Sequence, residues 1–305
     1  MNLRVVIAGG SGFIGQSLAK ALLSKKHEVV ILTRSPSHQS GGARFLNWDG
    51  KTVGDWAHSL DGAAAVVNLT GKSINCRHTP ENKREIIESR VNSVRVLGKA
   101  IALCAQPPGS FVQTSAVGIY GNSGSGWCDE ETPPGNDFMA EVCRQWEEAF
   151  DAAVTPATRK TLLRVGITLG PDGGFLPVLN RLTRWFLGGQ VGSGEQYISW
   201  IHVDDLIRMF MQAIERAEIV GLYSATAPHP VTNAELMREL RHAWHRPWSP
   251  PVPKWAVQTG ARLIGLEGSL AFSSQRCVPK HFLAQGFEFK FPKIEPALAD
   301  IVARS

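Results

Sequence analysis

The chain has 305 residues, which is enough for one large α/β domain or two smaller ones. Its 19% charged and 43% hydrophobic residues are typical of a soluble globular protein. The net charge of +5 suits an anionic ligand, but the basic residues are scattered and form no run interleaved with aromatic residues, so we expect no nucleic-acid partner.

The five cysteines are odd in number and widely spaced, and no Cys-x-x-Cys or His pair offers a zinc site. We therefore expect no metal and a reducing compartment. An apolar strand begins within three residues of Met1, which predicts that no signal or transit peptide precedes it. There is no apolar run of about 18 residues, so we expect no transmembrane helix. The expected protein is cytoplasmic, without a membrane partner, and either a monomer or a homodimer.

The N-terminal motif is a strand, a glycine-rich turn and a helix in direct succession. Residues 3–8 are apolar and rich in β-branched side chains, as in a buried strand, and the turn Gly9-Gly10-Ser11-Gly12-Phe13-Ile14-Gly15 follows. Ile14, Leu18 and Leu22 then recur every four residues, which predicts one apolar face of a helix. This order is typical of a dinucleotide-binding unit and predicts an α/β fold of the Rossmann type, with a doubly wound parallel sheet.

The glycines have a chemical reason in such a unit. The N-terminus of a helix offers unpaired N–H groups and the positive end of the helix dipole to a pyrophosphate. We expect Gly9 to allow the turn, Gly12 to allow close approach of the ligand, and Gly15 to let the helix pack tightly on the strand. The spacing is Gly-x-x-Gly-x-x-Gly rather than Gly-x-Gly-x-x-Gly. An ordinary βα turn is the alternative.

The end of the second predicted strand, residues 28–33, bears on the choice of cofactor. NAD sites commonly place an acidic residue here for the ribose 2′-hydroxyl. This chain has Thr33-Arg34-Ser35 instead, and a guanidinium suits a 2′-phosphate. We therefore predict NADP(H), against the alternative of a surface arginine.

Further strands and helices follow the same alternation. Strands are expected at residues 43–47 and 64–69, with Gly71 close to the adenosine half of the cofactor. A long helix follows, and its apolar face is formed by Ile87, Val91, Val94, Leu97, Ile101 and Cys104. A strand at residues 110–116 places Ser115 and Tyr120 near its carboxyl end, where ligands bind in this architecture. Tyr120 is equally well explained as a packing residue in a turn.

The rest of the chain departs from this alternation. Residues 122–135 are a polar loop and a candidate lid, and residues 138–150 a helix with Val142, Trp146 and Ala149 inward. A strand at 160–167 is expected to be broken by residues 170–174. Residues 200–206 predict a short strand and a helix capped by Asp204 or Asp205, with His202 structural. A last sheet strand is expected at residues 221–225, and Thr232 or Asn233 should cap another helix.

We predict two units on this basis. Residues 1–170 plus 201–227 would form the NADP-binding Rossmann domain, and residues 171–200 plus 228–305 a smaller C-terminal substrate lobe. Candidate lining residues of that lobe are Trp185, Tyr197, Trp200, Gln275, Arg276 and Lys280.

Several motifs together resemble a known family. The glycine turn, Asn68-Leu69-Thr70-Gly71, the end of the strand at 115–121 and Trp200-Ile201-His202-Val203-Asp204-Asp205-Leu206 resemble the extended short-chain dehydrogenase/reductases, the class of the nucleoside-diphosphate-sugar epimerases. Residues 83–91, 137–147, 188–194 and 275–280 are similar to an atypical subfamily of epimerase-family proteins, or NADP-dependent oxidoreductases. This resemblance covers nearly the whole chain.

The resemblance implies a set of residues that contact NADP(H). Gly71 and Ser115 are added to it because each lies at the end of a predicted strand. The set is Gly9, Gly10, Ser11, Gly12, Phe13, Ile14, Gly15, Thr33, Arg34, Leu69, Thr70, Gly71, Glu85, Arg90 and Ser115.

The catalytic residues of the family are missing in their standard form. Catalytic relatives use Tyr-x-x-x-Lys on the helix after the fifth strand, and the corresponding positions here are Phe138 and Val142. The usual catalytic Ser or Thr position is Ala116, with Ser115 beside it. The remaining catalytic candidates are Ser115, Tyr120 and Cys143.

Two functions fit this sequence. One is an NADP-dependent oxidoreductase or epimerase acting on a polar small molecule, for example a sugar nucleotide. The other is a catalytically silent NADP(H)-binding protein with a regulatory or redox-sensing role.

Overall fold

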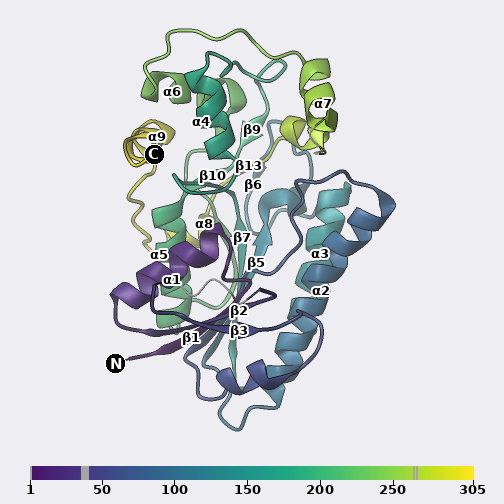
Figure 1. Cartoon of the computed structure of the whole chain (residues 1–305), viewed down its shortest axis with the longest axis vertical. Coiled ribbons are helices and arrows are strands. Elements are labelled where there is room, and N and C mark those ends of the chain that lie inside the picture. Colours follow the sequence, from purple (N-terminus) through teal and green to yellow (C-terminus); the bar gives the residue numbers. More distant parts are fainter. Residues whose placement is uncertain (1, 36–40, 264, 266) are drawn as a thin grey trace.

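The fold is built on one seven-stranded sheet whose strands all run parallel. A computed structural model describes residues 2–35, 41–263, 265 and 267–305. The sheet has the order β3-β2-β1-β4-β5-β7-β11 (Figure 1). Its strands are β1 Arg4–Ala8, β2 Glu28–Thr33, β3 Arg44–Asn47, β4 Ala65–Asn68, β5 Ser110–Ala116, β7 Arg159–Val165 and β11 Gly221–Ala225. This topology confirms the predicted Rossmann-type α/β fold.

Helices cover both faces of the sheet, which explains why its central strands are apolar on both sides. Figure 1 shows α1 (Phe13–Ser24) and α5 (Val203–Glu215) on one face and α2 (Pro80–Ala102) and α3 (Phe138–Asp151) on the other. Residues of β1 point alternately into two cores: Val5 and Ile7 pack with α1 and α5, whereas Val6 and Ala8 pack with α2 and α3. The sheet thus fixes where each connecting loop emerges.

A third core lies in the upper part of Figure 1, around α4 (Leu176–Arg184), α6 (Asn233–Ala243) and α9 (Ile294–Ala303). Trp200 is 0% exposed in this core and donates its Nε1–H to the carbonyl of His229. The expectation that Trp200 lines a cleft is therefore wrong. Not all of the C-terminal region belongs to this third core, because Phe282 and Phe287 pack in the core beside α1 and α5 before α9 packs in the third core.

Short elements connect these cores. Three two-stranded pairs join segments far apart in the sequence: β8 (Ile167–Leu169) with β10 (Trp200–His202), β9 (Tyr197–Ile198) with β12 (Val231–Thr232), and β6 (Trp127–Cys128) with β13 (Arg276–Cys277). The remaining helices are η1 Asp55–Ser59, η2 Val117–Tyr120, α7 Lys254–Leu263, η3 Gly268–Phe272 and α8 Lys280–Ala284. Within the described ranges no helix is long and apolar enough to cross a membrane.

Two local expectations need correction, and a third is confirmed. The strand predicted at 160–167 is interrupted at Gly166, where a Cβ would lie 2.8 Å from the Ser199 carbonyl oxygen. The cap of α5 is His202, whose Nδ1 accepts from the backbone N–H of Asp204, so an imidazole takes the place expected for Asp204 or Asp205. Of the two caps expected for α6, Thr232 is the one observed, and it forms a capping box with Glu235.

Candidate functional site

The predicted cofactor residues lie mainly at the carboxyl ends of four neighbouring strands. In the sheet register Ala8 of β1 is next to Leu32 of β2 and Asn68 of β4, and Asn68 is next to Gln113 of β5. The glycine turn, Thr33, Leu69 and Ser115 therefore emerge at one edge of the sheet. From β1, the chain adds β2 and β3 on one side of the sheet and β4, β5 and β7 on the other. Open α/β sheets bind ligands at such a switch in strand order.

The three glycines of the turn have different structural roles. Gly9 has φ of +71°, a conformation that L side chains rarely adopt. A Cβ at Gly15 would lie 2.5 Å from the Cα of Gly10, so α1 packs directly on the turn. A Cβ at Gly12 would meet no protein atom nearer than 3.9 Å. The space in front of Gly12 is therefore open to a ligand.

The N-terminus of α1 leaves its donors free for an anion. Gly12 occupies the N-cap position, so no side chain caps the helix, and the first turn contains no acidic residue. The hydroxyl oxygen of Thr70 lies against Gly9, where a Cβ would approach it to 2.9 Å. That buried hydroxyl has no hydrogen-bond partner among the residues described. Free amides beside the open space at Gly12 fit the diphosphate of a dinucleotide, and the unpaired hydroxyl lies against Gly9 of the same turn.

The end of β2 presents a cation and hydroxyl groups next to this turn. Thr33 is buried and donates its hydroxyl to Ser11 Oγ at 3.3 Å, and its oxygen accepts from the backbone N–H of Ser35. Arg34 is exposed and makes no ion pair within the described part of the chain. A free guanidinium at this strand end suits a phosphate group.

Two predicted cofactor residues on α2 have protein partners. Arg90 packs against Gly71, where a Cβ would lie 2.9 Å from the guanidinium carbon. It donates to the carbonyls of Lys72 and Ile86, and burial lowers the pKa of its guanidinium. Glu85 is exposed and forms an ion pair with Lys72. Arg90 is thus fixed beside Gly71, whereas Glu85 lies at the surface.

A chain of hydrogen bonds links Ser115 to Tyr120. Ser115 Oγ donates to Glu147 at 2.6 Å, and Arg164 donates to both carboxylate oxygens of Glu147 at 3.1 and 2.8 Å. Arg164 also donates to the Tyr120 oxygen at 3.0 Å, and that hydroxyl donates to the carbonyl of Asp129 at 2.7 Å. The ion pair of Arg164 and Glu147 is largely buried, with side chains 7% and 13% exposed.

The three catalytic candidates differ in their protonation chemistry. Burial raises the pKa of Tyr120 to about 12. Burial, followed by the charge of Glu147, raises the pKa of the Cys143 thiol to about 12. Both groups stay protonated near neutral pH. Ser115 differs because its hydroxyl donates to the carboxylate of Glu147.

Phe138 and Val142 have packing roles. Phe138 is the first residue of α3, and its ring lies 5.1 Å from the ring of His78 and 4.9 Å from Lys83 Nζ. Val142 is buried. Neither side chain can exchange a proton.

The candidate lid at 122–135 is attached to the C-terminal region at several points. Its strand β6 pairs with β13, and the backbone N–H of Ser123 donates to the carbonyl of Ser274. Glu130 accepts from the backbone N–H groups of Ser224 and His281. The lid remains a prediction.

Sequence reasoning did not identify Glu147 and Arg164 as site residues. Arg164 lies within the buried strand β7, between apolar neighbours. A charged residue in such a strand requires a partner of opposite charge, so Arg164 was a signal that some acidic residue packs against this strand, but not which one.

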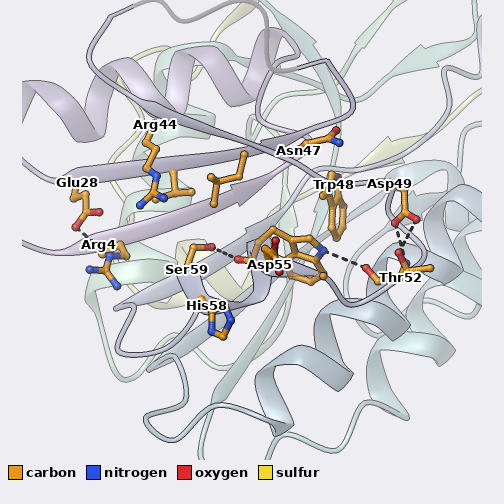
Figure 2. Close-up of a pocket in the computed structure, with 14 residues that line it drawn as sticks. Arg4, Glu28, Arg44, Asn47, Trp48, Asp49, Thr52, Asp55, His58 and Ser59 are labelled. Atoms are coloured by element: carbon orange, nitrogen blue, oxygen red, sulfur yellow. Dashed lines mark hydrogen bonds and ion pairs between the residues drawn. The ribbon is translucent and has the colours of Figure 1, made fainter.

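A hollow of about 660 Å³ lies elsewhere, beside β3 and η1 (Figure 2). None of the predicted site residues line it. Arg4 forms an ion pair with Glu28 at 3.0 Å, and Trp56 Nε1 donates to the Thr52 carbonyl at 3.1 Å. The carboxyl edge of the sheet, where the predicted site residues gather, is the stronger candidate site.

Comparison with known proteins shows the family to which the chain belongs. The NAD dependent epimerase/dehydratase family matches residues 5–223, and a domain of unknown function, DUF1731, matches residues 252–301. The chain is 36% identical over 309 residues to the chloroplastic SDR39U1 homologue of Arabidopsis thaliana, covering 99% of this chain and 87% of that protein. It is 31% identical over 303 residues to the epimerase family protein YfhF of Bacillus subtilis, covering 99% and 98%.

A solved structure is also similar over its full length. The crystal structure of human epimerase family protein SDR39U1 with NADPH has a TM-score of 0.87 and 32% identity, covering 99% of this chain and 100% of that chain. The chain therefore belongs to the NAD dependent epimerase/dehydratase family, as an SDR39U1-like epimerase family protein with a C-terminal DUF1731 domain.

Proposed function

We propose that this protein binds NADP(H) at the carboxyl edge of its sheet and acts as an oxidoreductase or epimerase on a polar small molecule, for example a sugar nucleotide. The observation that carries the proposal is the open space at Gly12 beside the free N-terminus of α1, together with the unpaired Thr70 hydroxyl against Gly9 of the same turn. The human relative crystallised with NADPH supports the choice of cofactor.

The chain's own residues would hold the cofactor in three places. The amides of the turn at Gly12 and the N-terminus of α1 would bind the diphosphate, and the Thr70 hydroxyl would donate to it. Arg34 would pair with the 2′-phosphate through charge-assisted hydrogen bonds. When bound, NADP(H) supplies or accepts a hydride at the nicotinamide C4.

Ser115 and Glu147 would move the proton that accompanies the hydride. As a substrate hydroxyl is oxidised, its O–H bond breaks and Ser115 Oγ accepts the proton, while the serine's own proton moves to Glu147 across the 2.6 Å hydrogen bond. Carbonyl reduction runs the same steps in reverse. The ion pair with Arg164 holds the carboxylate in place between these steps.

A second candidate function is a catalytically silent NADP(H)-binding protein that reports redox state to a partner. It is favoured by Phe138 and Val142, which occupy the positions of the usual catalytic pair and cannot titrate. The absorbance of NADPH, followed against a panel of carbonyl compounds and sugar nucleotides, separates the two functions. Turnover supports the enzyme, whereas tight binding without turnover across the panel supports the silent protein.

The residue roles are tested once a substrate is found. Ser115→Ala should lower kcat by about 10²–10⁴, the usual contribution of general acid–base catalysis. Tyr120→Phe keeps the aromatic ring and should leave kcat nearly unchanged. A large loss in Tyr120→Phe with little loss in Ser115→Ala would transfer the role to Tyr120.

A further inference from the structure

Cys128 and Cys277 lie opposite each other on two short paired strands. Cys128 belongs to β6 and Cys277 to β13, and the parallel register pairs them directly. The backbone N–H of Val278 donates to the Cys128 carbonyl at 3.0 Å, which fixes this register. Neighbouring strands run about 4.7–4.9 Å apart, and the two Cα atoms of a disulfide are usually about 4.4–6.8 Å apart. The strand pairing therefore brings the two cysteines within the range that a disulfide spans.

The two thiols meet in one buried cluster, which also contains Tyr120 and Cys143. The Cys277 thiol acts as a hydrogen-bond donor to Cys128, and this holds the pKa of Cys128 below its usual range. The same hydrogen bond, followed by burial, raises the pKa of Cys277. A cysteine that readily forms a thiolate thus lies beside one that stays protonated. Such a pair can supply both the attacking and the resolving sulfur of an oxidation.

Cys128 lies just beneath the surface of the protein. It is 2% exposed and Cys277 is 0% exposed, but residues 124–127, directly before Cys128, are exposed. A small oxidant therefore has a short path to Cys128. The pKa values of Cys104 and Cys143 are raised by burial, which makes their thiols less reactive. Cys128 is thus the sulfur that an oxidant should meet first.

We propose that Cys128 and Cys277 form an oxidation site at which a hydroperoxide converts the two thiols into a reversible disulfide. The Cys128 thiolate attacks the terminal oxygen of the hydroperoxide, the O–O bond breaks, and the departing oxygen takes up the proton that Cys128 released. The Cys277 sulfur then bonds to Cys128 and displaces the hydroxyl of the sulfenic acid, which leaves as water with the Cys277 proton. Two thiols are oxidised, and the hydroperoxide is reduced to an alcohol or to water.

The disulfide joins the 122–135 segment covalently to β13 of the C-terminal region. Cys128 is next to Asp129, whose carbonyl accepts a hydrogen bond from Tyr120 at 2.7 Å. Tyr120 in turn accepts from Arg164, which holds Glu147 beside Ser115. Oxidation therefore fixes one side of the candidate site in place. This inference goes beyond the proposed function and does not depend on cofactor binding.

The experiment treats the folded full-length chain with a small molar excess of hydrogen peroxide, followed by catalase. Remaining thiols are blocked with N-ethylmaleimide, and the digested protein is mapped by mass spectrometry. The proteins are the parent, Cys128→Ser, Cys277→Ser and Cys104→Ser. Cys104 is the control because it is half-buried and lies outside the cluster of Cys128 and Cys277. Dimedone, added to parallel samples, traps any sulfenic acid.

The parent should lose two of its five free thiols and give one pair of peptides joined through Cys128 and Cys277. Dithiothreitol should restore both thiols, and Cys104→Ser should form the same disulfide. Cys277→Ser should accumulate a dimedone adduct at Cys128, since a serine hydroxyl can still donate the hydrogen bond but cannot resolve the sulfenic acid. Cys128→Ser should give no adduct at Cys277.

Two results with the parent alone would overturn the inference, so it does not depend on the folding of the variants. One is the absence of this disulfide in the folded protein while it forms after unfolding in urea. The other is a different linkage, for example Cys128 to Cys143. Hydrogen exchange of residues 123–129 and 274–278 measures the structural effect. Exchange should slow on oxidation and recover with dithiothreitol, and equal rates in both states would contradict the fixing of this segment.

Discussion

Ser115 at the end of β5 donates a 2.6 Å hydrogen bond to Glu147 of α3, and the same carboxylate receives two hydrogen bonds from Arg164 of β7. Three elements are therefore joined by one side chain. The carboxylate neutralises a buried arginine, and in the proposed function it would also accept the proton of the Ser115 hydroxyl.

The structural role predicts a large loss of stability in Glu147→Ala. Removing the carboxylate leaves Arg164, which is 6% exposed, without its partner. Breaking a buried ion pair in this way costs about 3–5 kcal/mol of unfolding free energy. Urea unfolding of the parent and the variant measures this loss. Glu148→Ala, at the exposed neighbouring position, is the control and should change stability little. Equal stability of both variants would show that Glu147 does not stabilise the fold.

The glycine turn predicts different effects for substitutions at Gly12 and Gly15: the first should prevent NADPH binding, and the second should lower stability. Gly12→Val should fold normally, because its Cβ meets no protein atom nearer than 3.9 Å, but its side chain fills the space for the diphosphate. At about 100 times its Kd, a ligand that binds the folded state adds ~2.7 kcal/mol, so NADPH should raise the Tm of the parent and not of Gly12→Val.

Gly15→Ala should instead lower the Tm without ligand, because its Cβ would lie 2.5 Å from Gly10 Cα. Overpacking of this kind costs about 1–3 kcal/mol. Thermal unfolding with and without NADPH measures both effects. A full response of Gly12→Val to NADPH would show that the diphosphate binds elsewhere.

Cys143 predicts a loss of stability at alkaline pH. Burial raises the pKa of its thiol from 9.0 to about 12 in the folded protein. Between these values the unfolded chain releases the thiol proton and the folded protein retains it, so the free energy of unfolding falls as pH rises. The contribution of this one group is at most about 1.4 kcal/mol per pH unit.

Urea unfolding over that pH range tests the effect. Cys143→Ala should show a shallower decline than the parent, and Cys76→Ala, on a surface loop, should follow the parent. Parallel declines of the parent and Cys143→Ala would contradict the raised pKa.

The main features of the fold followed from the sequence because they depend on local patterns. Alternating apolar strands and amphipathic helices indicated the parallel sheet, and the glycine turn located its first crossover. The break at Gly166 was not predicted, since it depends on the approach of Ser199, which lies 33 residues further along the chain. The His202 cap was missed because imidazole is an uncommon capping group and Asp204 and Asp205 offered more usual ones.

The candidate site was less accessible to sequence reasoning. Gly12, Thr70 and Arg34 are recognised from positions relative to predicted strand ends. The contacts of Glu147 with Ser115 and Arg164 depend instead on how α3 packs across β5 and β7, which no local pattern specifies. Arg276 was predicted as a lining residue of the C-terminal lobe. Its placement between Trp127 and Tyr197 could not be predicted, because it depends on the pairing of Trp127 with Arg276, which are 149 residues apart in the sequence.

Calorimetric titration of the parent and Arg34→Ala with NADPH and NADH tests the central claim most directly. Arg34 is exposed at the end of β2 and makes no ion pair in the described part of the chain, so its loss removes a contact with the 2′-phosphate rather than a structural one. Losing a charge-assisted hydrogen bond costs roughly 1.5–3 kcal/mol. Arg44→Ala, an exposed arginine at the start of β3, controls for the change in net charge.

The account predicts that the parent binds NADPH more tightly than NADH, that Arg34→Ala weakens NADPH by about tenfold to a hundredfold with little effect on NADH, and that Arg44→Ala changes neither. Equal losses for the two cofactors in Arg34→Ala, or equal affinities of the parent for both, would contradict it.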